Sequence, residues 1–191
     1  MQKSKRLLTV LLIIALAIGL GIGVHLLWNF WEEKTHPTTY SDLIKTYSAE
    51  YDVPEEIIFS VIKVESDFEP HAKSSVGAMG LMQMMPSTFE WLTGEEHLNE
   101  NLPSLLLYDP EVSIRYGTYY LRYLYLKFGN WDTVLAAYNG GEGNVAKWLT
   151  DPSYSDGNGN LTYIPFEETR NYVKKVNDAK ATYEKLYYND H

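Results

Sequence analysis

The apolar positions of this chain fall into one continuous run, followed by shorter stretches with helical spacing. The run covers residues 7–28 (LLTVLLIIALAIGLGIGVHLLW) and contains no formally charged side chain. As a helix it would measure about 33 Å at ~1.5 Å per residue, enough to cross a hydrocarbon core of ~30 Å. Lys3, Lys5 and Arg6 precede the run, and Trp28 and Trp31 stand at its far end, as at a membrane interface. The pattern predicts a membrane-spanning helix.

A cleaved secretory signal is the alternative interpretation of this run. Such signals have an apolar region of roughly 7–15 residues and end in a small-x-small cleavage site. Here the run is longer and ends in VHLLWNFW, which contains no such site. We therefore expect residues 1–28 to be a basic cytoplasmic end with an uncleaved anchor and residues 29–40 to be a tether. The rest of the chain is expected outside the cytoplasm, in a single-pass topology.

From residue 41 onward the apolar residues recur at helical spacing, and turn-forming residues separate the stretches. Neither a sustained alternation of period two nor an internal repeat is present in the sequence. The spacing predicts an all-α domain over residues 41–191. Its expected helices cover residues 41–51, a stretch from Pro54, 86–92, 110–128, 131–138, a stretch through Trp148, and a final one from near Phe166 to about Tyr187.

Charge and composition exclude several classes of function for this protein. All 25 acidic residues and only 13 of the 16 basic ones lie from residue 29 onward, so that portion carries a formal charge of −12. Such an acidic domain is a poor candidate for binding nucleic acid or anionic lipid through bulk charge. Cysteine is absent, which excludes disulfides, thiolate metal sites and cysteine nucleophiles. The five histidines show no metal-ligand spacing, so neither a metal nor a cofactor is expected.

One acidic loop partly fits a calcium-binding pattern. Asp156, Asn158, Asn160 and Glu167 have suitable spacing, but Leu161 occupies the position where the pattern requires glycine. A plain turn is the favoured interpretation, because Asn, Asp and Gly form turns in any case.

The helix after Pro54 contains the most informative residue. Ile57, Ile58, Val61 and Ile62 form a core-facing stripe, and Glu65 follows Val61 by four positions and Ile62 by three. A carboxyl group on such a stripe is expected to have a raised pKa, because burial disfavours its charged form and the C-terminal end of its helix is negative. The alternative is a glutamate that reaches solvent at a helix end. Asp67, two residues further on, should point roughly the opposite way and be solvated.

A glycine- and methionine-rich segment, GAMGLMQMMP, occupies residues 77–86. Its two glycines allow close backbone approach or positive φ. Gln83 is the polar residue of this run and can both donate and accept hydrogen bonds. The methionines, taken singly, are best explained as adaptable core filling.

Four sequence blocks occur in one order: Glu65-Ser66, GLMQMMP at 80–86, AYN at 137–139 and IPFEETRNYV at 164–173. Together they resemble the soluble lytic transglycosylase domain of the lysozyme-like enzymes that cut bacterial peptidoglycan, from about Tyr40 to Lys185. The resemblance implies a lysozyme-like helical fold with Glu65 as the single catalytic acid/base. It also implies a set of substrate-binding residues: Ser74, Gln83, Met85, Tyr138, Asn139, Glu168 and Tyr172.

A single carboxyl group, that of Glu65, can be enough to cleave a glycosidic bond at such a site. Most glycosidases use two carboxylates, but one is enough where the substrate itself supplies the nucleophile. In the family that the chain resembles, the acetamido group and then the C6 hydroxyl of N-acetylmuramic acid have that role. The expected products end in a 1,6-anhydro sugar, and no water is consumed.

Two other functions remain open at this stage. A goose-type lysozyme-like muramidase would cut the same bond with water, and a membrane-tethered wall-binding or assembly protein would have a catalytically silent site.

The expected location is the bacterial cell membrane, anchored through residues 7–28, with peptidoglycan glycan strands as the main partner. An unspecified cell-wall or secretion machine is a further expected partner, and nucleic acid is not expected.

Tyrosines crowd one predicted helix. Tyr116, Tyr119, Tyr120 and Tyr123 share one face and are expected to form a core stripe, whereas Tyr125 points elsewhere. Stacking on sugar rings is the alternative role for any of them.

Overall fold

The computed structural model describes the backbone of residues 2–188 and the side chains of residues 9 and 11–188. The chain divides into two compact units, Met1–Pro37 and Thr38–His191. The side chains of Lys3, Lys5 and Arg6, on which the expected cytoplasmic end depends, lie outside the described set.

The first unit consists almost entirely of the long helix α1 (Gln2–Thr35). Its stretch Leu11–Thr35 is long and apolar enough to cross a membrane, judged by length and composition alone. The helix passes the predicted end of the span at Trp28, so of the predicted tether only residues 36–40 lie outside a helix. The physical reason is that neither glycine nor proline occurs between Trp28 and Pro37, and Pro37 disfavours the helical conformation of the residue before it.

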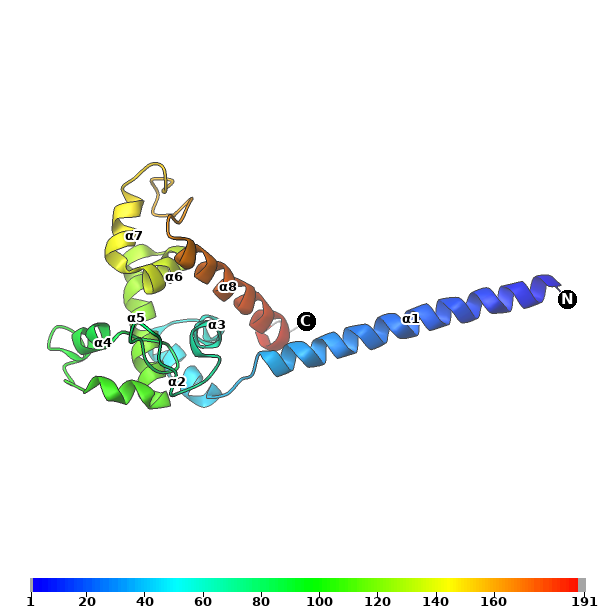
Figure 1. Cartoon of the computed structure of the whole chain (residues 1–191), viewed down its shortest axis with the longest axis horizontal. Helices are drawn as coiled ribbons and strands as arrows, with labels where there is room; N and C mark the ends of the chain where they lie inside the picture. The colour runs from blue at the N-terminus through cyan, green and yellow to red at the C-terminus, as the bar shows by residue number, and fades with distance from the viewer. Residues whose placement is uncertain (1, 189–191) are drawn as a thin grey trace. The chain divides into compact units, whose positions relative to one another are not determined.

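The second unit is entirely helical in its regular structure across residues 38–188, which confirms the all-α prediction (Figure 1). Short β-bridges such as Met79 with Met84 occur singly and form no strand in this described part. The elements are α2 (Ser41–Tyr51), α3 (Glu55–Ser66), α4 (Pro86–Thr93), the 3₁₀ helix η1 (Ser104–Tyr108), α5 (Pro110–Phe128), α6 (Trp131–Gly140), α7 (Glu142–Leu149), α8 (Glu167–Tyr183) and the π-helical turn η2 (Glu184–Tyr188).

The boundaries of the longest helix in this unit, α5, follow from local sequence. The Asp109 side chain accepts hydrogen bonds from the backbone N–H groups of Glu111 and Val112, and Pro110 occupies the first turn, where it needs no N–H partner. The helix ends where Gly129 adopts a φ of 72°, a left-handed conformation that glycine tolerates best.

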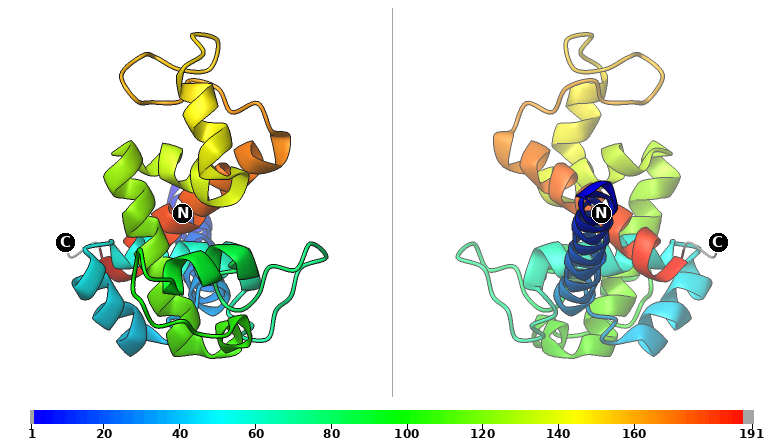
Figure 2. Two further views of the ribbon diagram at one scale, coloured as in Figure 1. Left: turned by 90° about the vertical axis from the view of Figure 1, so that its left-hand side faces the viewer. Right: turned by 90° about the vertical axis from the view of Figure 1, so that its right-hand side faces the viewer.

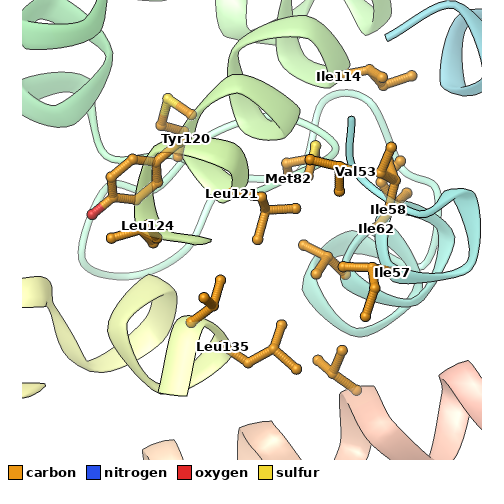
Figure 3. Close-up of a cluster of buried hydrophobic side chains, with 14 of the residues drawn as sticks. Val53, Ile57, Ile58, Ile62, Met82, Ile114, Tyr120, Leu121, Leu124 and Leu135 are labelled. Carbon is orange, nitrogen blue, oxygen red and sulfur yellow. The ribbon is translucent and has the colours of Figure 1, made fainter. Parts of the chain in front are cut away.

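The core lies where α3, α5 and α6 meet (Figure 3). Ile57, Ile58 and Ile62 of α3 are fully buried, and they face Leu121 of α5 and Leu135 of α6. The predicted apolar stripe of α3 is therefore the core-facing side of that helix. Burying each such side chain stabilises the fold by about 1.5–3 kcal/mol relative to leaving it exposed. Helix α8 packs along α3, and this pair places the last helix beside the end of α3.

The glycine- and methionine-rich segment is folded tightly against η1. Gly77 and Gly80 both have positive φ, 96° and 78°. A Cβ atom on Gly80 would lie 1.9 Å from the carbonyl oxygen of Leu107, so no side chain fits there. Met79, Met82 and Met84 are buried, as expected for core filling, whereas Met85 is 39% exposed.

The turn-rich segment after α7 lies at one end of the second unit, far from α2 (Figure 2). One Asp156 carboxylate oxygen accepts hydrogen bonds from the backbone N–H groups of Asn158 and Asn160, and the other accepts one from the Asn160 amide. The loop thus uses its acidic side chain to close its own turn. Among the residues that the structure describes, no group of three or more His, Asp or Glu side chains is arranged to hold a metal ion.

The tyrosines of α5 follow the predicted division only in part, because Tyr125, expected to point elsewhere, is also partly buried against the core. Tyr116 and Tyr120 are buried, and Tyr119 and Tyr123 are half-buried against the core. Tyr125 stacks on Trp131 with the ring centroids 4.6 Å apart.

Candidate active site

Glu65 lies in the last turn of α3, next to the glycine- and methionine-rich segment. The helix ends at Ser66 because Asp67 adopts a left-handed conformation with φ of 51°. The Ser66 hydroxyl donates a hydrogen bond to the carbonyl of Leu81 at 2.7 Å, which ties the end of α3 to that segment. Asp67, by contrast, has a side chain that is 73% exposed, in agreement with its predicted solvation. It forms an ion pair with Lys63.

The Glu65 carboxyl group has an unusual affinity for protons. Burial raises its pKa to about 7; the Tyr172 hydroxyl partly offsets this, and the nearby Glu168 carboxylate adds to it. The direction is that expected from the apolar stripe. A carboxyl group with this pKa exists in both protonation states at neutral pH, so it can donate a proton and later remove one.

Two tyrosines lie close to this carboxyl group, of which Tyr138 is half-buried and Tyr172 is buried. Tyr138 of α6 donates its hydroxyl proton to the carbonyl of Met82 at 2.8 Å, which fixes its ring against the methionine-rich segment. Tyr172 of α8 has a buried hydroxyl that makes no hydrogen bond of ordinary length within the described residues. It is nevertheless near enough to Glu65 to lower the pKa of that carboxyl group.

A cavity of about 220 Å³ opens beside Glu65, and we call it the catalytic pocket. Six of the seven predicted substrate-binding residues line it together with Glu65, and Tyr172 is the exception. Tyr172 lines an adjoining cavity of about 300 Å³, which shares Glu65, Asn139 and Glu168 with the catalytic pocket. The structure thus gathers the seven predicted substrate-binding residues around the carboxyl group of Glu65.

Two of the polar residues also build the pocket wall. The Ser74 hydroxyl accepts a hydrogen bond from the backbone N–H of Ala78 at 2.9 Å. The amide nitrogen of Gln83 donates to the carbonyls of Ala72 and Gly80, at 3.0 and 2.9 Å. Both of these bonds use the nitrogen of Gln83, so its amide oxygen is the atom that can accept from a ligand.

The sequence reasoning missed several lining residues. Val76, which is 75% exposed, and Ala78 complete the catalytic pocket, and Asn171 and Lys175 line the adjoining cavity. A helical signal for the last two was present, because Glu168, Asn171, Tyr172 and Lys175 follow the i, i+3, i+4, i+7 spacing of one face of α8. No local pattern marked Val76 or Ala78.

Comparison with known proteins gives a consistent result. Residues 42–159 match the family model described as the transglycosylase SLT domain. The chain is 40% identical over 161 residues to the soluble lytic murein transglycosylase of Escherichia coli K12, covering 82% of this chain and 24% of that protein. It is 31% identical over 189 residues to the membrane-bound lytic murein transglycosylase C of Klebsiella pneumoniae, covering 88% of this chain and 52% of that protein.

Solved structures agree with the sequence comparison. The 70-kDa soluble lytic transglycosylase of E. coli superposes with a TM-score of 0.73 at 38% identity, covering 81% of this chain and 25% of that one. A second structure of the 70-kDa enzyme, in complex with bulgecin A, gives the same values. The likeness confirms the expected lysozyme-like helical fold. The chain spans about a quarter of the length of the soluble curated relatives that it matches.

Proposed function

Because this chain belongs to the transglycosylase SLT family, we propose that it is a peptidoglycan lytic transglycosylase. The proposed reaction cleaves the β-1,4 bond between N-acetylmuramic acid and N-acetylglucosamine and leaves a 1,6-anhydro end on the muramic acid. The observation that carries the proposal is the position of Glu65, a half-buried residue whose carboxyl group has a pKa of about 7, in a pocket lined by polar groups.

The proposed mechanism uses Glu65 twice. Its protonated carboxyl group donates a proton to the glycosidic oxygen as the bond to C1 breaks, while the acetamido group of the muramic acid attacks C1. The resulting carboxylate then removes the proton of the C6 hydroxyl. O6 attacks C1, displaces the acetamido oxygen and closes the 1,6-anhydro ring. The products contain the same atoms as the substrate, so no water is consumed. The protein itself contributes only the transfer of a proton through Glu65.

The other site residues have positioning and binding roles in this proposal. Tyr172 holds the Glu65 carboxylate through its nearby hydroxyl, and Glu168 and Asn139 face the substrate where the two cavities join. Ser74 and Gln83, which line the catalytic pocket, bind sugar substituents. Met85 and Tyr138 shape the remaining surface of the catalytic pocket.

Mass spectrometry of the muropeptides released from purified peptidoglycan tests this function. We expect products one water lighter than those of hydrolysis, because O6 rather than water attacks C1. Products of full hydrolytic mass would assign the chain to the goose-type lysozyme-like reaction instead. Release of no product, with retained binding to the wall, would indicate a silent wall-binding protein.

We further propose that residues 7–28 anchor the protein in the bacterial cell membrane in a single pass. The N-terminus would be cytoplasmic, and the catalytic unit would face the cell wall. The apolar helix α1 supports this placement, and so does the name of the Klebsiella relative, which is described as membrane-bound.

A truncated chain that begins at Thr38 tests the anchor. We expect it to be soluble and active on peptidoglycan, because the second unit has its own buried core and contains every site residue. The full chain should remain with membranes after a high-salt wash and be released by detergent. An unfolded truncated chain, measured by circular dichroism, would show that residues 1–37 belong to the catalytic fold.

A further inference from the structure

A cavity of about 240 Å³ lies at the end of α3 opposite to Glu65, and we call it the α2–α3 pocket. None of the residues that line it lines either cavity beside Glu65. Its polar side chains come from three places: Thr38, Ser41 and Lys45 from α2 and the residues before it, Glu55 from the start of α3, and Tyr187 and Tyr188 from η2.

The α2–α3 pocket contains one basic and one acidic side chain that do not pair with each other. Among the residues that the structure describes, the Lys45 ammonium group forms no ion pair. The Oε2 atom of Glu55 accepts a hydrogen bond from the Tyr188 hydroxyl at 2.8 Å, which holds the carboxylate in place and leaves its Oε1 atom for a ligand. The two charges suit a ligand that carries one positive and one negative group.

Aromatic rings form the side of the pocket next to Glu55. Phe59 is buried and stacks on Tyr183 with the ring centroids 5.2 Å apart, and the Tyr187 ring lies 5.9 Å from that of Tyr183. Tyr187 and Tyr188 are 41% and 38% exposed, so their rings are accessible from the pocket. Because aromatic faces attract ammonium groups, this side favours the positive end of the ligand.

The covalent chain keeps the α2–α3 pocket close to the proposed membrane anchor. Helix α1 ends at Thr35, and three peptide units join that residue to Thr38, so their Cα atoms are at most about 11 Å apart. Residues 29–35 rise about 10 Å beyond the proposed span, and the headgroup layer on each side of a bilayer is roughly 5–8 Å deep. The link is therefore short enough for the pocket to reach lipid headgroups.

Net charge favours one class of headgroup over another. The portion of the chain from residue 29 onward has a formal charge of −12, which repels anionic lipids. A headgroup with zero net charge avoids that repulsion. It also supplies the positive and negative groups for which Glu55 and Lys45 are placed.

We propose that the α2–α3 pocket binds the phosphoethanolamine headgroup of a membrane phospholipid, with the ammonium group on Glu55 and the phosphate on Lys45. The hydroxyl groups of Thr38 and Ser41 donate hydrogen bonds to the phosphate. This assignment rests on the proposed membrane anchor and goes beyond the proposed reaction.

A bound lipid has a consequence for the site of cleavage. Glu55 and Glu65 stand ten residues apart on α3, which is about 15 Å along the helix axis. A headgroup held at Glu55 therefore fixes the height of the catalytic carboxyl group above the membrane surface. Cleavage is then restricted to glycan strands at that height.

Native mass spectrometry of retained lipid tests the inference. The full chain is reconstituted in vesicles of equal parts phosphatidylethanolamine and phosphatidylglycerol, extracted in mild detergent and weighed with its bound lipid. We expect one phosphatidylethanolamine per chain, retained about ten times as often as phosphatidylglycerol. Lys45→Gln and Glu55→Gln should each lower this retention about tenfold, because each leaves one charge of the headgroup without its partner.

Two matched variants control for the change of charge. Lys147→Gln and Glu90→Gln remove the same charges from exposed side chains of α7 and α4 that do not line the α2–α3 pocket. Both should retain phosphatidylethanolamine as the parent does, and circular dichroism checks the fold of all four variants. Equal retention of the two lipids by the parent would overturn the inference, as would unchanged retention in Lys45→Gln and Glu55→Gln.

Free O-phosphoethanolamine distinguishes a lipid from a soluble ligand of the same chemistry. It is titrated calorimetrically into the full chain in detergent micelles, and we expect binding that Lys45→Gln and Glu55→Gln weaken. Binding of this free compound by a chain that retains no phosphatidylethanolamine would assign the pocket to a soluble zwitterion and overturn the lipid assignment.

The outcomes also separate this inference from the earlier proposals. A chain that stays with membranes after a high-salt wash but retains no phosphatidylethanolamine keeps the anchor and loses the lipid pocket. A chain that the wash releases loses the anchor, whereas lipid retention that depends on Lys45 and Glu55 would still support the pocket. The same retention by a chain that releases no muropeptide would support the pocket while the catalytic proposal fails.

Discussion

Glu65→Gln is expected to lower the rate of peptidoglycan cleavage by about a thousandfold, which is within the usual contribution of a general acid–base group. Glutamine keeps the size and shape of the side chain but cannot transfer a proton. The apolar stripe of α3 and the contact between Ser66 and Leu81 are not altered by the change, so the fold should be retained. The measurement is the rate of muropeptide release from purified sacculi, with circular dichroism as the check on folding.

Asp67→Asn is the matched control for that result. It removes the same charge two residues further along, from a side chain that is 73% exposed, and asparagine tolerates the left-handed backbone at this position. We expect the parental rate. Cleavage retained by Glu65→Gln would remove Glu65 from its proposed role. Loss in both variants would attribute the effect to the charge of this region rather than to proton transfer.

The second large effect concerns pH. The pKa of Glu65 is raised by burial from 4.5 to about 7, so the folded chain binds this proton more tightly than the unfolded chain does. A group of this kind contributes stability that is fully present below the unfolded pKa and is lost as pH rises through the folded pKa. Between about pH 4.5 and pH 7 the parental protein should therefore lose on the order of 3 kcal/mol that Glu65→Gln does not lose.

Urea denaturation of the parent and of Glu65→Gln at pH 4 and at pH 8 measures this difference. The two free energies of unfolding should be similar at pH 4, where both side chains are neutral, and Glu65→Gln should be the more stable at pH 8. A difference that is the same at both pH values would show that the Glu65 carboxylate is solvated in the folded chain. The cleavage rate of the parent should also fall above about pH 7, because the donating form of Glu65 disappears.

Tyr172→Phe provides a control on the cause of the pH dependence. The Tyr172 hydroxyl lowers the pKa of Glu65, so its removal should raise that pKa and move the alkaline limb of the rate profile to higher pH. A purely structural role for Tyr172 would reduce the rate at every pH without moving the limb.

Local sequence determined most of the fold. The helix boundaries follow from residues within a few positions of each end, as Asp109 and Gly129 show for α5. The stripe of α3 followed from helical spacing, and that spacing also placed Glu65 at the edge of the core. The order of the four sequence blocks was enough to indicate the family. The predicted tether, residues 29–40, is helical as far as Thr35, because no proline or glycine interrupts the chain between Trp28 and Pro37.

Tertiary packing decided which of these residues meet. Glu168 and Tyr172 follow Glu65 by about a hundred positions, and only the packing of α8 along α3 brings them beside its carboxyl group. Capping and helical periodicity act within a few residues and can be inferred from sequence. The distance between side chains on different helices depends on how those helices pack, which spacing along the chain does not determine.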